Sequence, residues 1–396
     1  MLANSYPLPL IIDYLGEDRD ITAAEEEGIM HALQLRARVR RIRLRMSFTK
    51  LQKFLVVINQ PFPILEYLYI RPPAKHNSGL ILPNTFQAPH LRHLVLHSFA
   101  FPIKSPLLTT TVGLVTLSLV EVHGSTYFHP NDLLQQLSLL PQLEILEIDF
   151  HFPVPSRDVA RQLSQKPIVT HLPLPNVRQL TLGGVMPYLE ALLPRITAPL
   201  LEKLEIWLFL QLNFSVPRLR DFISATENLR FGSATFEFNK NYVRVNVYPH
   251  QGAAMYNFSL TIHCKYLDWQ VVSAAQIFSA LTTVFSAVEY LSLSVFRYPL
   301  PPETNNEVHR TQWRELLMLF SNVKTLRVDA GLADELSRAL QVDDGEAPME
   351  LLPELEVLLC HFRDHTSQAF KPFIDARQNA GHPVLLLNWP YPRGFP

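Results

Sequence analysis

The chain has 396 residues, of which 47% are hydrophobic and 18% are charged, and its formal net charge is −1. This apolar fraction excludes a disordered chain, and the near-zero charge gives no general attraction to nucleic acid or to a membrane surface. No signal peptide or membrane-length apolar run is evident, and the two cysteines lie far apart, so we expect a cytoplasmic or nuclear protein.

The first predicted element is a strand over residues 7–14. A short pattern then recurs: an apolar residue, two variable residues, Leu or Ile, one variable residue, and a second Leu or Ile. Clear copies read VRRIRL from Val39, LEYLYI from Leu65, LRHLVL from Leu91, LVTLSL from Leu114, LEILEI from Leu143, VRQLTL from Val177, LEKLEI from Leu201, VEYLSL from Val288, VKTLRV from Val323 and LEVLLC from Leu355. Weaker copies are expected at Leu229 and Phe258. The copies lie about 23 to 35 residues apart, a spacing typical of leucine-rich repeats or slightly longer.

The spacing within each copy predicts a strand with one buried face. The fourth and sixth residues point the same way, into a core, and the first residue enters that core as the chain turns into the strand. The third, fifth and seventh residues point away. A proline often stands two residues before the copy, at Pro63, Pro89, Pro141, Pro175, Pro199 and Pro353. We expect it where a strand begins, because its missing N–H is not needed in the ladder there.

Helices are predicted between the strands, over residues 133–140, 216–228, 273–285, 310–320 and 332–340, and Asn131 is the expected cap of the first. Alternating strands and helices indicate an α/β fold: an irregular leucine-rich-repeat solenoid, a curved array of parallel strands with helices on the convex side. We expect one solenoid over residues 1–396. Residues 1–45 would form an N-terminal cap and first repeat, 46–360 the repeats, and 361–396 a C-terminal cap.

Several segments carry a resemblance to a known family: PLPLIIDYLGEDRDIT from Pro7, RVRRIRLRM from Arg38, FPILEYLYI from Phe62, TFQAPHLRHLVL from Thr85, LLTTTVGLVTLSLV from Leu107, YLEALLPRITAPLLEKLEI from Tyr188 and FIDARQNAGHPV from Phe373. Together they resemble the leucine-rich-repeat region of F-box-like proteins of mushroom-forming fungi, over nearly the whole chain. The resemblance implies a substrate-holding region, and an F-box would add docking onto the linker subunit of a cullin–RING ubiquitin ligase. An F-box itself is not evident.

The chain shows no motif of a known catalytic chemistry. P-loop, dinucleotide-binding, HExxH and G-x-S-x-G patterns are absent from the sequence. The run CHFRDH from Cys360 offers metal ligands, but no second Cys/His pair stands near it, and a strand end running into a polar loop explains it better. On a strand, His93 and His97 would lie about 13 Å apart, too far for one ion. The acidic run 343–346 is expected to be a solvated turn. We therefore expect no cofactor, no metal and no catalysis.

A cluster of arginines is the main candidate for a binding site. If Val39, Ile42 and Leu44 face the core, Arg41, Arg43 and Arg45 line the opposite, concave face, and the next strand presents Tyr67, Tyr69 and Arg71 beside them. Arg forks and Tyr rings suit carboxylates, phosphates and interface anchors. The alternative is ordinary surface charge, neutralised by Glu25, Glu26 and Glu27. The same rule of alternation nominates His93, His97, Glu147, Asp149, Lys203, Trp207, Tyr290, Arg327 and Asp329.

The function that fits these features is a protein-binding module, with an anionic segment as a possible ligand. Two alternatives remain open: the substrate-recognition part of an F-box-type ubiquitin ligase adaptor, and a stand-alone scaffold or truncated paralogue that recruits no ligase. An enzyme is less favoured, because a solenoid supplies an extended surface and no convergent reactive set is visible.

Overall fold

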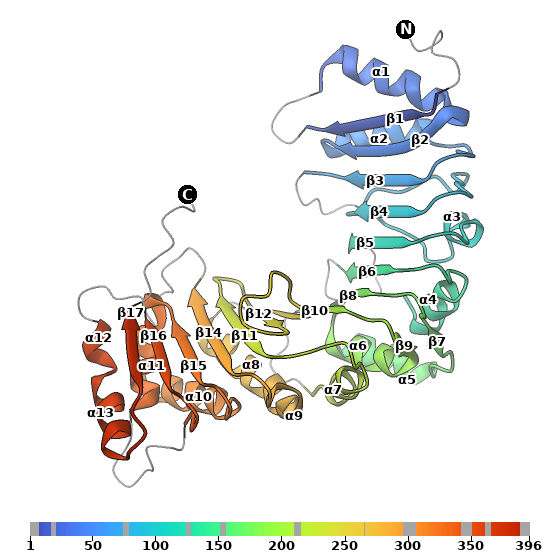
Figure 1. Ribbon diagram of the computed structural model, residues 1–396. Helices are drawn as coiled ribbons and strands as arrows, with labels where there is room; N and C mark the ends of the chain where they lie inside the picture. The colour runs from blue at the N-terminus through green and yellow to red at the C-terminus, as the bar shows by residue number, and fades with distance from the viewer. Residues whose placement is uncertain are drawn as a thin grey trace. The chain divides into compact units, whose positions relative to one another are not determined.

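A computed structural model of the chain describes residues 8–16, 21–73, 79–123, 128–150, 156–209, 215–264, 266–295, 306–341, 351–360 and 366–388. The chain divides into two compact units, Met1–Glu202 and Lys203–Pro396, which we call unit 1 and unit 2 (Figure 1). The single solenoid expected over residues 1–396, with its two caps, stays a prediction. Among the described residues, no helix combines the length and apolarity needed to cross a bilayer.

Unit 1 is a parallel sheet whose strands follow the order β1-β2-β3-β4-β5-β6-β8. Its strands are β1 (Leu10–Leu15), β2 (Val39–Arg45), β3 (Tyr67–Arg71), β4 (His93–His97), β5 (Thr116–Val122), β6 (Ile145–Phe150) and β8 (Gln179–Gly184), with a small pair formed by β7 (Leu172–Pro173) and β9 (Ile196–Thr197). Its helices are α1 (Ala23–Gln34), α2 (Phe48–Val57), α3 (Pro106–Thr110), α4 (Pro130–Leu137), α5 (Ser156–Gln165) and α6 (Met186–Leu192), with 3-10 turns at Arg36–Arg38 and Leu193–Arg195.

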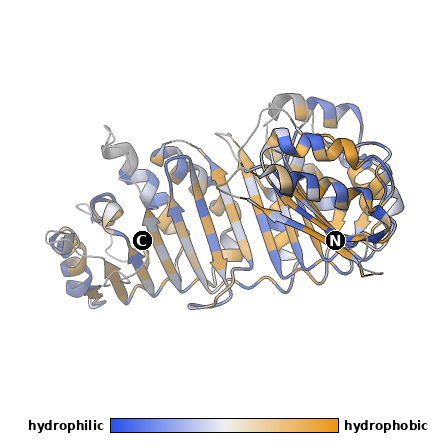
Figure 2. Cartoon of the chain, turned by 90° about the horizontal axis from the view of Figure 1, so that it is seen from above, coloured by the Kyte–Doolittle hydropathy of each residue, from blue (hydrophilic) through white to orange (hydrophobic). Residues whose placement is uncertain are grey.

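The expected inward positions of the repeat are confirmed. Ile42 and Leu44 of β2 are fully buried, as are their counterparts Leu68 and Ile70 of β3. In every clear copy of the pattern the first, fourth and sixth residues are at most 2% exposed. Hydrophobic and hydrophilic positions alternate along the strands accordingly (Figure 2). The apolar side chains of each strand are covered by the flanking helices and by the side chains of the next strand, which is the packing of a solenoid.

The recurrent proline lies in a turn before the strand, not at the strand's first residue. In the copy at Leu65, the carbonyl of buried Phe62 accepts a hydrogen bond from the Leu65 N–H at 3.3 Å, with Pro63 as the second turn residue. The same bond recurs at Leu91, Leu143, Val177, Leu201 and Leu355, at 3.0 to 3.4 Å. Proline is favoured at the second position of a β-turn because its fixed φ suits that site. The strand begins two residues after the copy does.

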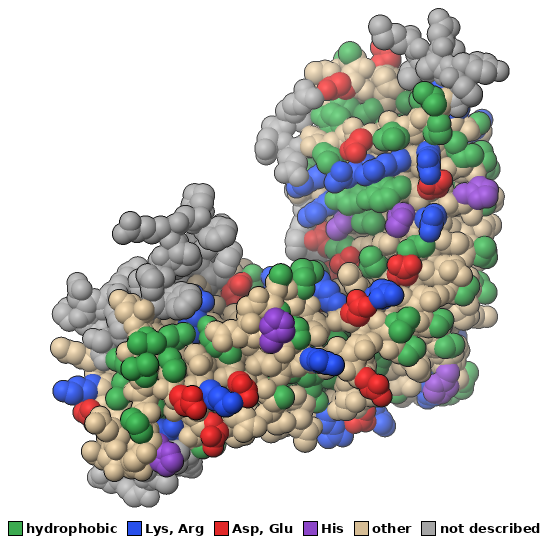
Figure 3. Space-filling model, in the orientation of Figure 1, with side chains coloured by type: hydrophobic (Ala, Val, Ile, Leu, Met, Phe, Trp, Pro, Cys, Tyr) green, Lys and Arg blue, Asp and Glu red, His purple; other side chains and the backbone are tan. Residues whose placement is uncertain are grey.

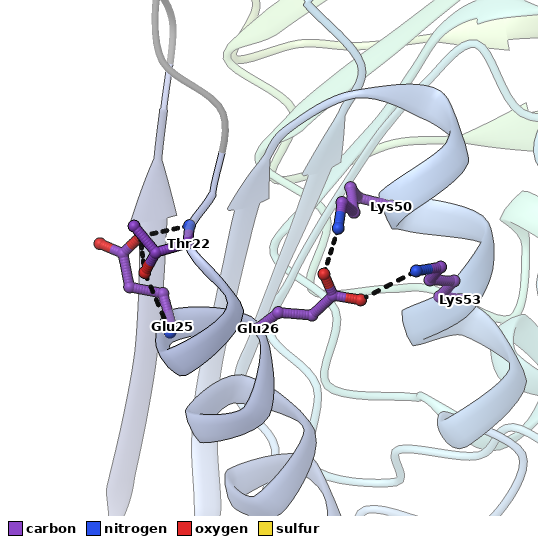
Figure 4. A network of polar contacts seen from close by, with 5 residues as sticks. All are labelled: Thr22, Glu25, Glu26, Lys50 and Lys53. Carbon is purple, nitrogen blue, oxygen red and sulfur yellow. Dashed lines mark hydrogen bonds and ion pairs between the residues drawn. The ribbon is translucent and has the colours of Figure 1, made fainter.

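Two helices at the start of unit 1, α1 and α2, were not expected from the pattern. A capping box begins α1: the Thr22 hydroxyl accepts from the Glu25 N–H, and the Glu25 carboxylate accepts from the Thr22 N–H (Figure 4). The next residue, Glu26, forms ion pairs with Lys50 and, at 3.1 Å, Lys53 of α2. These bonds hold the two helices together and lower the pKa of Glu26, chiefly through Lys50.

Unit 2 repeats the alternation of strands and helices with one interruption. Its strands are β10 (Lys203–Phe209), β11 (Ser233–Phe238), β12 (Tyr242–Tyr248), β13 (Phe258–His263), β14 (Tyr290–Val295), β15 (Thr325–Val328), β16 (Val357–Cys360) and β17 (Leu385–Asn388). Its helices are α7 (Pro217–Ser224), α8 (Leu267–Ala280), α9 (Thr282–Phe285), α10 (Asn306–Met318), α11 (Ala333–Leu340), α12 (Thr366–Ala369) and α13 (Lys371–Asn379), with a 3-10 turn at Ala330–Leu332.

The prediction that all strands are parallel is wrong at β12. This strand pairs antiparallel with both β11 and β13, and the order β10-β13-β12-β11-β14 reverses the sequence of the three middle strands. The weak copy at Phe258 has a shifted frame, because the buried apolar residues of β13 are Phe258, Leu260 and Ile262. Parallel pairing resumes on either side, between β10 and β13 and between β11 and β14. The α/β class is confirmed, with one antiparallel excursion.

The helix predictions were right in place and partly wrong in extent. The segment 273–285 is two helices, α8 and α9, of which α8 begins earlier, at Leu267. The expected cap Asn131 lies inside α4, whose N-cap is His129 with Pro130 following. Proline suits the first helical position, so the helix begins at Pro130, earlier than the expected residue 133. The Asn131 amide instead bonds the Val169 N–H at 3.0 Å and the Pro167 carbonyl at 2.8 Å.

A buried arginine fastens α13 to the turn that precedes β16. Arg377 is 1% exposed, and its guanidinium donates to the backbone carbonyls of Leu352, Pro353 and Leu355 at 3.0 to 3.2 Å. Three carbonyl bonds to one charged group satisfy much of its hydrogen-bonding capacity in a site closed to water.

We therefore expect Arg377→Met to destabilise unit 2, because the apolar side chain leaves these carbonyls without their donor. The free energy of unfolding should fall by about 3 kcal/mol, measured from the urea midpoint. Lys371→Met on the exposed side of the same helix is the control and should change stability little. An unchanged urea midpoint for Arg377→Met would show that these hydrogen bonds make no net contribution to the free energy of unfolding.

Candidate functional site

The candidate site is the open face of unit 1, the face of its sheet that bears the outward residues of the repeat. Strand register sets these residues in rows. One row runs from Ile11 to Arg41, Tyr67 and His93, and the next from Asp13 to Arg43 and Tyr69. Figure 3 shows this face, with a band of Lys and Arg side chains beside a band of hydrophobic ones, each running along the strands, and histidines next to them.

Two arginines of β2 stack on two tyrosines of β3. The guanidinium carbon of Arg41 lies 4.6 Å from the Tyr67 ring centre, and that of Arg43 lies 5.6 Å from the Tyr69 ring centre. Such cation–π contacts hold the guanidinium plane while leaving its N–H groups able to bind an anion. The arginine–tyrosine pairing expected from the sequence is therefore present, and it pre-orients two cationic groups.

The histidines of β4 extend the aromatic surface. The rings of Tyr67 and His93 lie 5.7 Å apart, and those of Tyr69 and His97 lie 5.9 Å apart. Burial and the charge of Arg92 lower the pKa of His93. Burial, then the charge of Arg71, lowers the pKa of His97 to about 4, against the opposing effect of Glu121. Both rings are therefore neutral at pH 7.

This low pKa links His97 to stability. An unfolded histidine titrates near pH 6.5, so the unfolded state takes up the proton first as the pH falls. The stability that neutral His97 contributes is complete above about pH 6.5 and is lost as the pH falls through about 4.

One of the acidic residues expected to neutralise the arginine cluster binds other cations. The Glu26 carboxylate pairs with the lysines of α2. Two other carboxylates lie beside the arginines: Asp13 is 3.8 Å from Arg43, and Glu66 is 2.9 Å from Arg40. The interpretation of the cluster as ordinary surface charge neutralised by Glu25, Glu26 and Glu27 is therefore corrected for Glu26 and stays a prediction for the other two.

The two acidic candidates of β6 differ. Glu147 accepts a hydrogen bond from the Ser118 hydroxyl of β5 at 2.5 Å, within the open face. Asp149 is only 4% exposed, so a partner does not reach it readily. A Cβ built on Gly183, its register partner, would lie 2.1 Å from the Asp149 carboxylate, so glycine there makes room for the buried acid.

The candidates of unit 2 are brought into their own contacts. Lys203 pairs with Glu205 at 2.6 Å and lies 4.5 Å from the Tyr256 ring centre, and the Tyr256 hydroxyl donates to Glu205 at 2.9 Å. Asp329 lies just past β15, where its carboxylate accepts from the Gly331 N–H. Trp207, Tyr290 and Arg327 are half-buried outward residues of β10, β14 and β15, as expected.

The sequence interpretation missed an aromatic group around β12. Phe209 stacks on His263 at 5.1 Å between ring centres, the His263 and Tyr242 rings meet at 5.9 Å, and Arg244 lies 5.3 Å from the Tyr242 ring centre. The strict alternation YVRVNVY from Tyr242 is a strand signal that identifies Tyr242 and Arg244 as outward residues. This run does not fit the repeat, so the repeat pattern does not predict it.

The thiols do not offer a reactive or ligating group. Cys264 and Cys360 are buried and unpaired, and burial raises the pKa of each to about 12. No group of three or more His, Cys, Asp or Glu placed to hold a metal ion occurs among the described residues. The remainder of the CHFRDH run and the acidic run 343–346 lie outside them.

Comparisons with known proteins add little to this geometry. No family model matches the chain, and no curated protein sequence matches it. Among solved structures it is similar to the leucine-rich repeat-containing protein LegL7 from Legionella pneumophila. The two are 14% identical over 75% of this chain and 90% of that one, with a TM-score of 0.28. So loose a superposition carries no argument, and the leucine-rich-repeat description rests on the buried pattern and strand order.

The charge environment of His97 makes a testable prediction. In protein labelled with ¹³C at histidine, the His97 resonance, assigned with His97→Gln, should titrate with a midpoint near pH 4. Arg71→Gln should raise that midpoint, because a repelling charge is removed, while burial keeps it below about 6.5. Arg195→Gln is the matched control, since Arg195 bonds His171 at 2.8 Å elsewhere in unit 1. A midpoint near 6.5 in the unmodified protein would contradict this description.

Proposed function

We propose that the chain is a non-catalytic protein-binding module and that the open face of unit 1 holds an anionic segment of a partner protein. The observation that carries the proposal is the stacking of Arg41 and Arg43 on Tyr67 and Tyr69. Arginine and tyrosine dominate interface hot spots, and a guanidinium already held in place loses less side-chain entropy on binding.

Apolar side chains lie beside the charged ones. Ile11 is 66% exposed opposite Arg41, and Leu15 is 40% exposed opposite Arg45. A segment that combines acidic and apolar residues would therefore meet matching groups on both strands. The chemistry of this face is recognition, since neutral histidines and stacked arginines bind and orient a ligand.

The resemblance to F-box-like proteins supports a more specific proposal: that this module is the substrate-recognition part of a ubiquitin ligase adaptor in the cytoplasm or nucleus. Such an adaptor would also bind the linker subunit of a cullin–RING ligase through an F-box. A stand-alone scaffold that binds the same partner without recruiting a ligase is the alternative. The open face would act in the same way in both.

The proposal predicts preferential binding of acidic peptides. We would measure fluorescence anisotropy of a labelled peptide of alternating glutamate and leucine, and of its lysine counterpart, with the full chain. The glutamate peptide should bind more tightly, and the double variant Arg41→Gln, Arg43→Gln should weaken its binding by about tenfold or more.

The double variant Arg178→Gln, Arg195→Gln is the control, because it removes the same charge from positions outside the open face of unit 1. It should bind the glutamate peptide as the unmodified protein does. Equal affinity for the two peptides, or equal weakening by both double variants, would overturn the proposal.

A further inference from the structure

The open face of unit 1 carries the same contact twice, at two successive outward positions. In each case an arginine of β2 lies over a tyrosine ring of β3: Arg41 over Tyr67 at 4.6 Å, and Arg43 over Tyr69 at 5.6 Å. Residues two apart on a strand point to the same face and lie about 6.6 Å apart. On the side of β3, the two arginines therefore have the same kind of neighbour.

The two arginines differ in the residue that β1 places beside them. Asp13 is opposite Arg43 in the strand register, and its carboxylate lies 3.8 Å from Nη1 of that arginine. The residue opposite Arg41 is Ile11, whose side chain is exposed. The guanidinium of Arg43 therefore has a carboxylate from its own chain, whereas that of Arg41 has an apolar neighbour in the equivalent place.

Arg41 has no carboxylate partner among the residues that the structure describes. The acidic residue just before β3, Glu66, pairs with Arg40 at 2.9 Å. The Tyr67 ring holds the Arg41 guanidinium in place, but a cation–π contact does not neutralise its charge. An anion that reaches this face would therefore gain most at Arg41.

We propose that Ile11 and Asp13 determine which charge pattern the open face accepts: a partner segment with one acidic residue at Arg41 and an uncharged residue two positions along, at Arg43. This specificity rests on the proposed function, because the same anionic segment lies on the same face. A second acidic residue would be attracted by Arg43 and repelled by Asp13, so it would add little to binding. Repulsion of the wrong partner is one of the two physical routes to specificity.

The segment that fits this pattern is extended and lies along the strands. Its residues two apart have the spacing of Arg41 and Arg43 along β2, about 6.6 Å. Exposed apolar side chains of β1, those of Ile11 and Leu15, flank the charged ones on the same face. The ligand is thus an extended peptide in which a single acidic residue stands among apolar and uncharged ones.

The test uses three peptides in the frame Leu-Ser-Leu-Ser-X-Ser-Z-Ser-Leu, in which X and Z are glutamine twice, glutamate then glutamine, or glutamate twice. We call them the no-acid, one-acid and two-acid peptides, and their affinity for the full chain is measured by fluorescence anisotropy. The one-acid peptide should bind at least about fivefold more tightly than the no-acid peptide. The two-acid peptide should bind within about twofold of the one-acid peptide, because Asp13 opposes its second carboxylate.

Variants of β1 test the role of each residue. Asp13→Asn should let the two-acid peptide bind about fivefold more tightly than the one-acid peptide, because Arg43 then has no carboxylate opposite it. Ile11→Asp should remove most of the advantage of the one-acid peptide over the no-acid peptide, because it places a carboxylate opposite Arg41. Ile11→Asn loses the same apolar side chain without adding a charge, so it should weaken both peptides alike and keep the ratio between them.

Glu202→Gln is a further control, because it removes a carboxylate that pairs with Arg178 elsewhere in unit 1, and it should leave all three affinities unchanged. Unchanged thermal midpoints show that the variants fold. A two-acid peptide that binds the unmodified protein about fivefold more tightly than the one-acid peptide, or an Asp13→Asn variant with an unchanged ratio, overturns this specificity and leaves the proposed function standing. Equal loss of the one-acid advantage in Ile11→Asp and Ile11→Asn does the same. Equal binding of the one-acid and no-acid peptides to the unmodified protein contradicts the proposed function itself.

Discussion

The structure depends on one constraint: a strand of the repeat cannot bury its apolar side chains by itself. Ile42 and Leu44 point inward from β2, and they are covered because Leu68 and Ile70 of the next strand continue the same layer. A turn before most strands adds a further buried residue, such as Phe62, whose carbonyl closes the turn. Each repeat therefore stabilises its neighbours, which is the nearest-neighbour logic of solenoids.

The open face follows from the same packing. Register that aligns the buried residues also aligns the outward ones, because alternate residues of a strand occupy opposite faces. Arg41 comes to lie over Tyr67, and Arg45 comes to lie opposite Arg71, because this register sets them there. The outward residues of successive repeats thus determine the charge pattern of the face. Substituting them changes the packing of the core little.

Much of this could be predicted from the sequence, because the repeat specifies both faces of each strand. The inward residues and the stacking of Arg41 and Arg43 beside tyrosines required only alternation. The predictions that were wrong concern interactions that the repeat does not specify. The reversal at β12 breaks the repeat, and the engagement of Glu26 by Lys50 depends on how two helices pack. The burial of Asp149 depends on a glycine in the neighbouring strand.

The helix-capping and turn errors have local causes. Asn131 is a good cap in isolation, but Pro130 before it takes the first helical position, so His129 becomes the N-cap. The sequence interpretation explained the proline before a strand by its missing N–H. In the structure the proline lies in a β-turn, where its fixed φ is the property that matters. The sequence therefore identifies Asn131 and the recurrent proline as important residues but does not distinguish between the two roles that each residue type can have.

The central claim, that the strands of unit 1 stack in parallel register, is tested most directly by cross-linking. Val95 of β4 is opposite Ser118 of β5, and Thr116 lies two residues along the same strand. The double variant Val95→Cys, Ser118→Cys should oxidise to a disulfide, because the two backbones are about 4.8 Å apart. The pair Val95→Cys, Thr116→Cys should not, because its separation of about 8 Å is too long. Equal cross-linking of both pairs, or of the second alone, as measured by mass spectrometry, would contradict the register on which the open face depends.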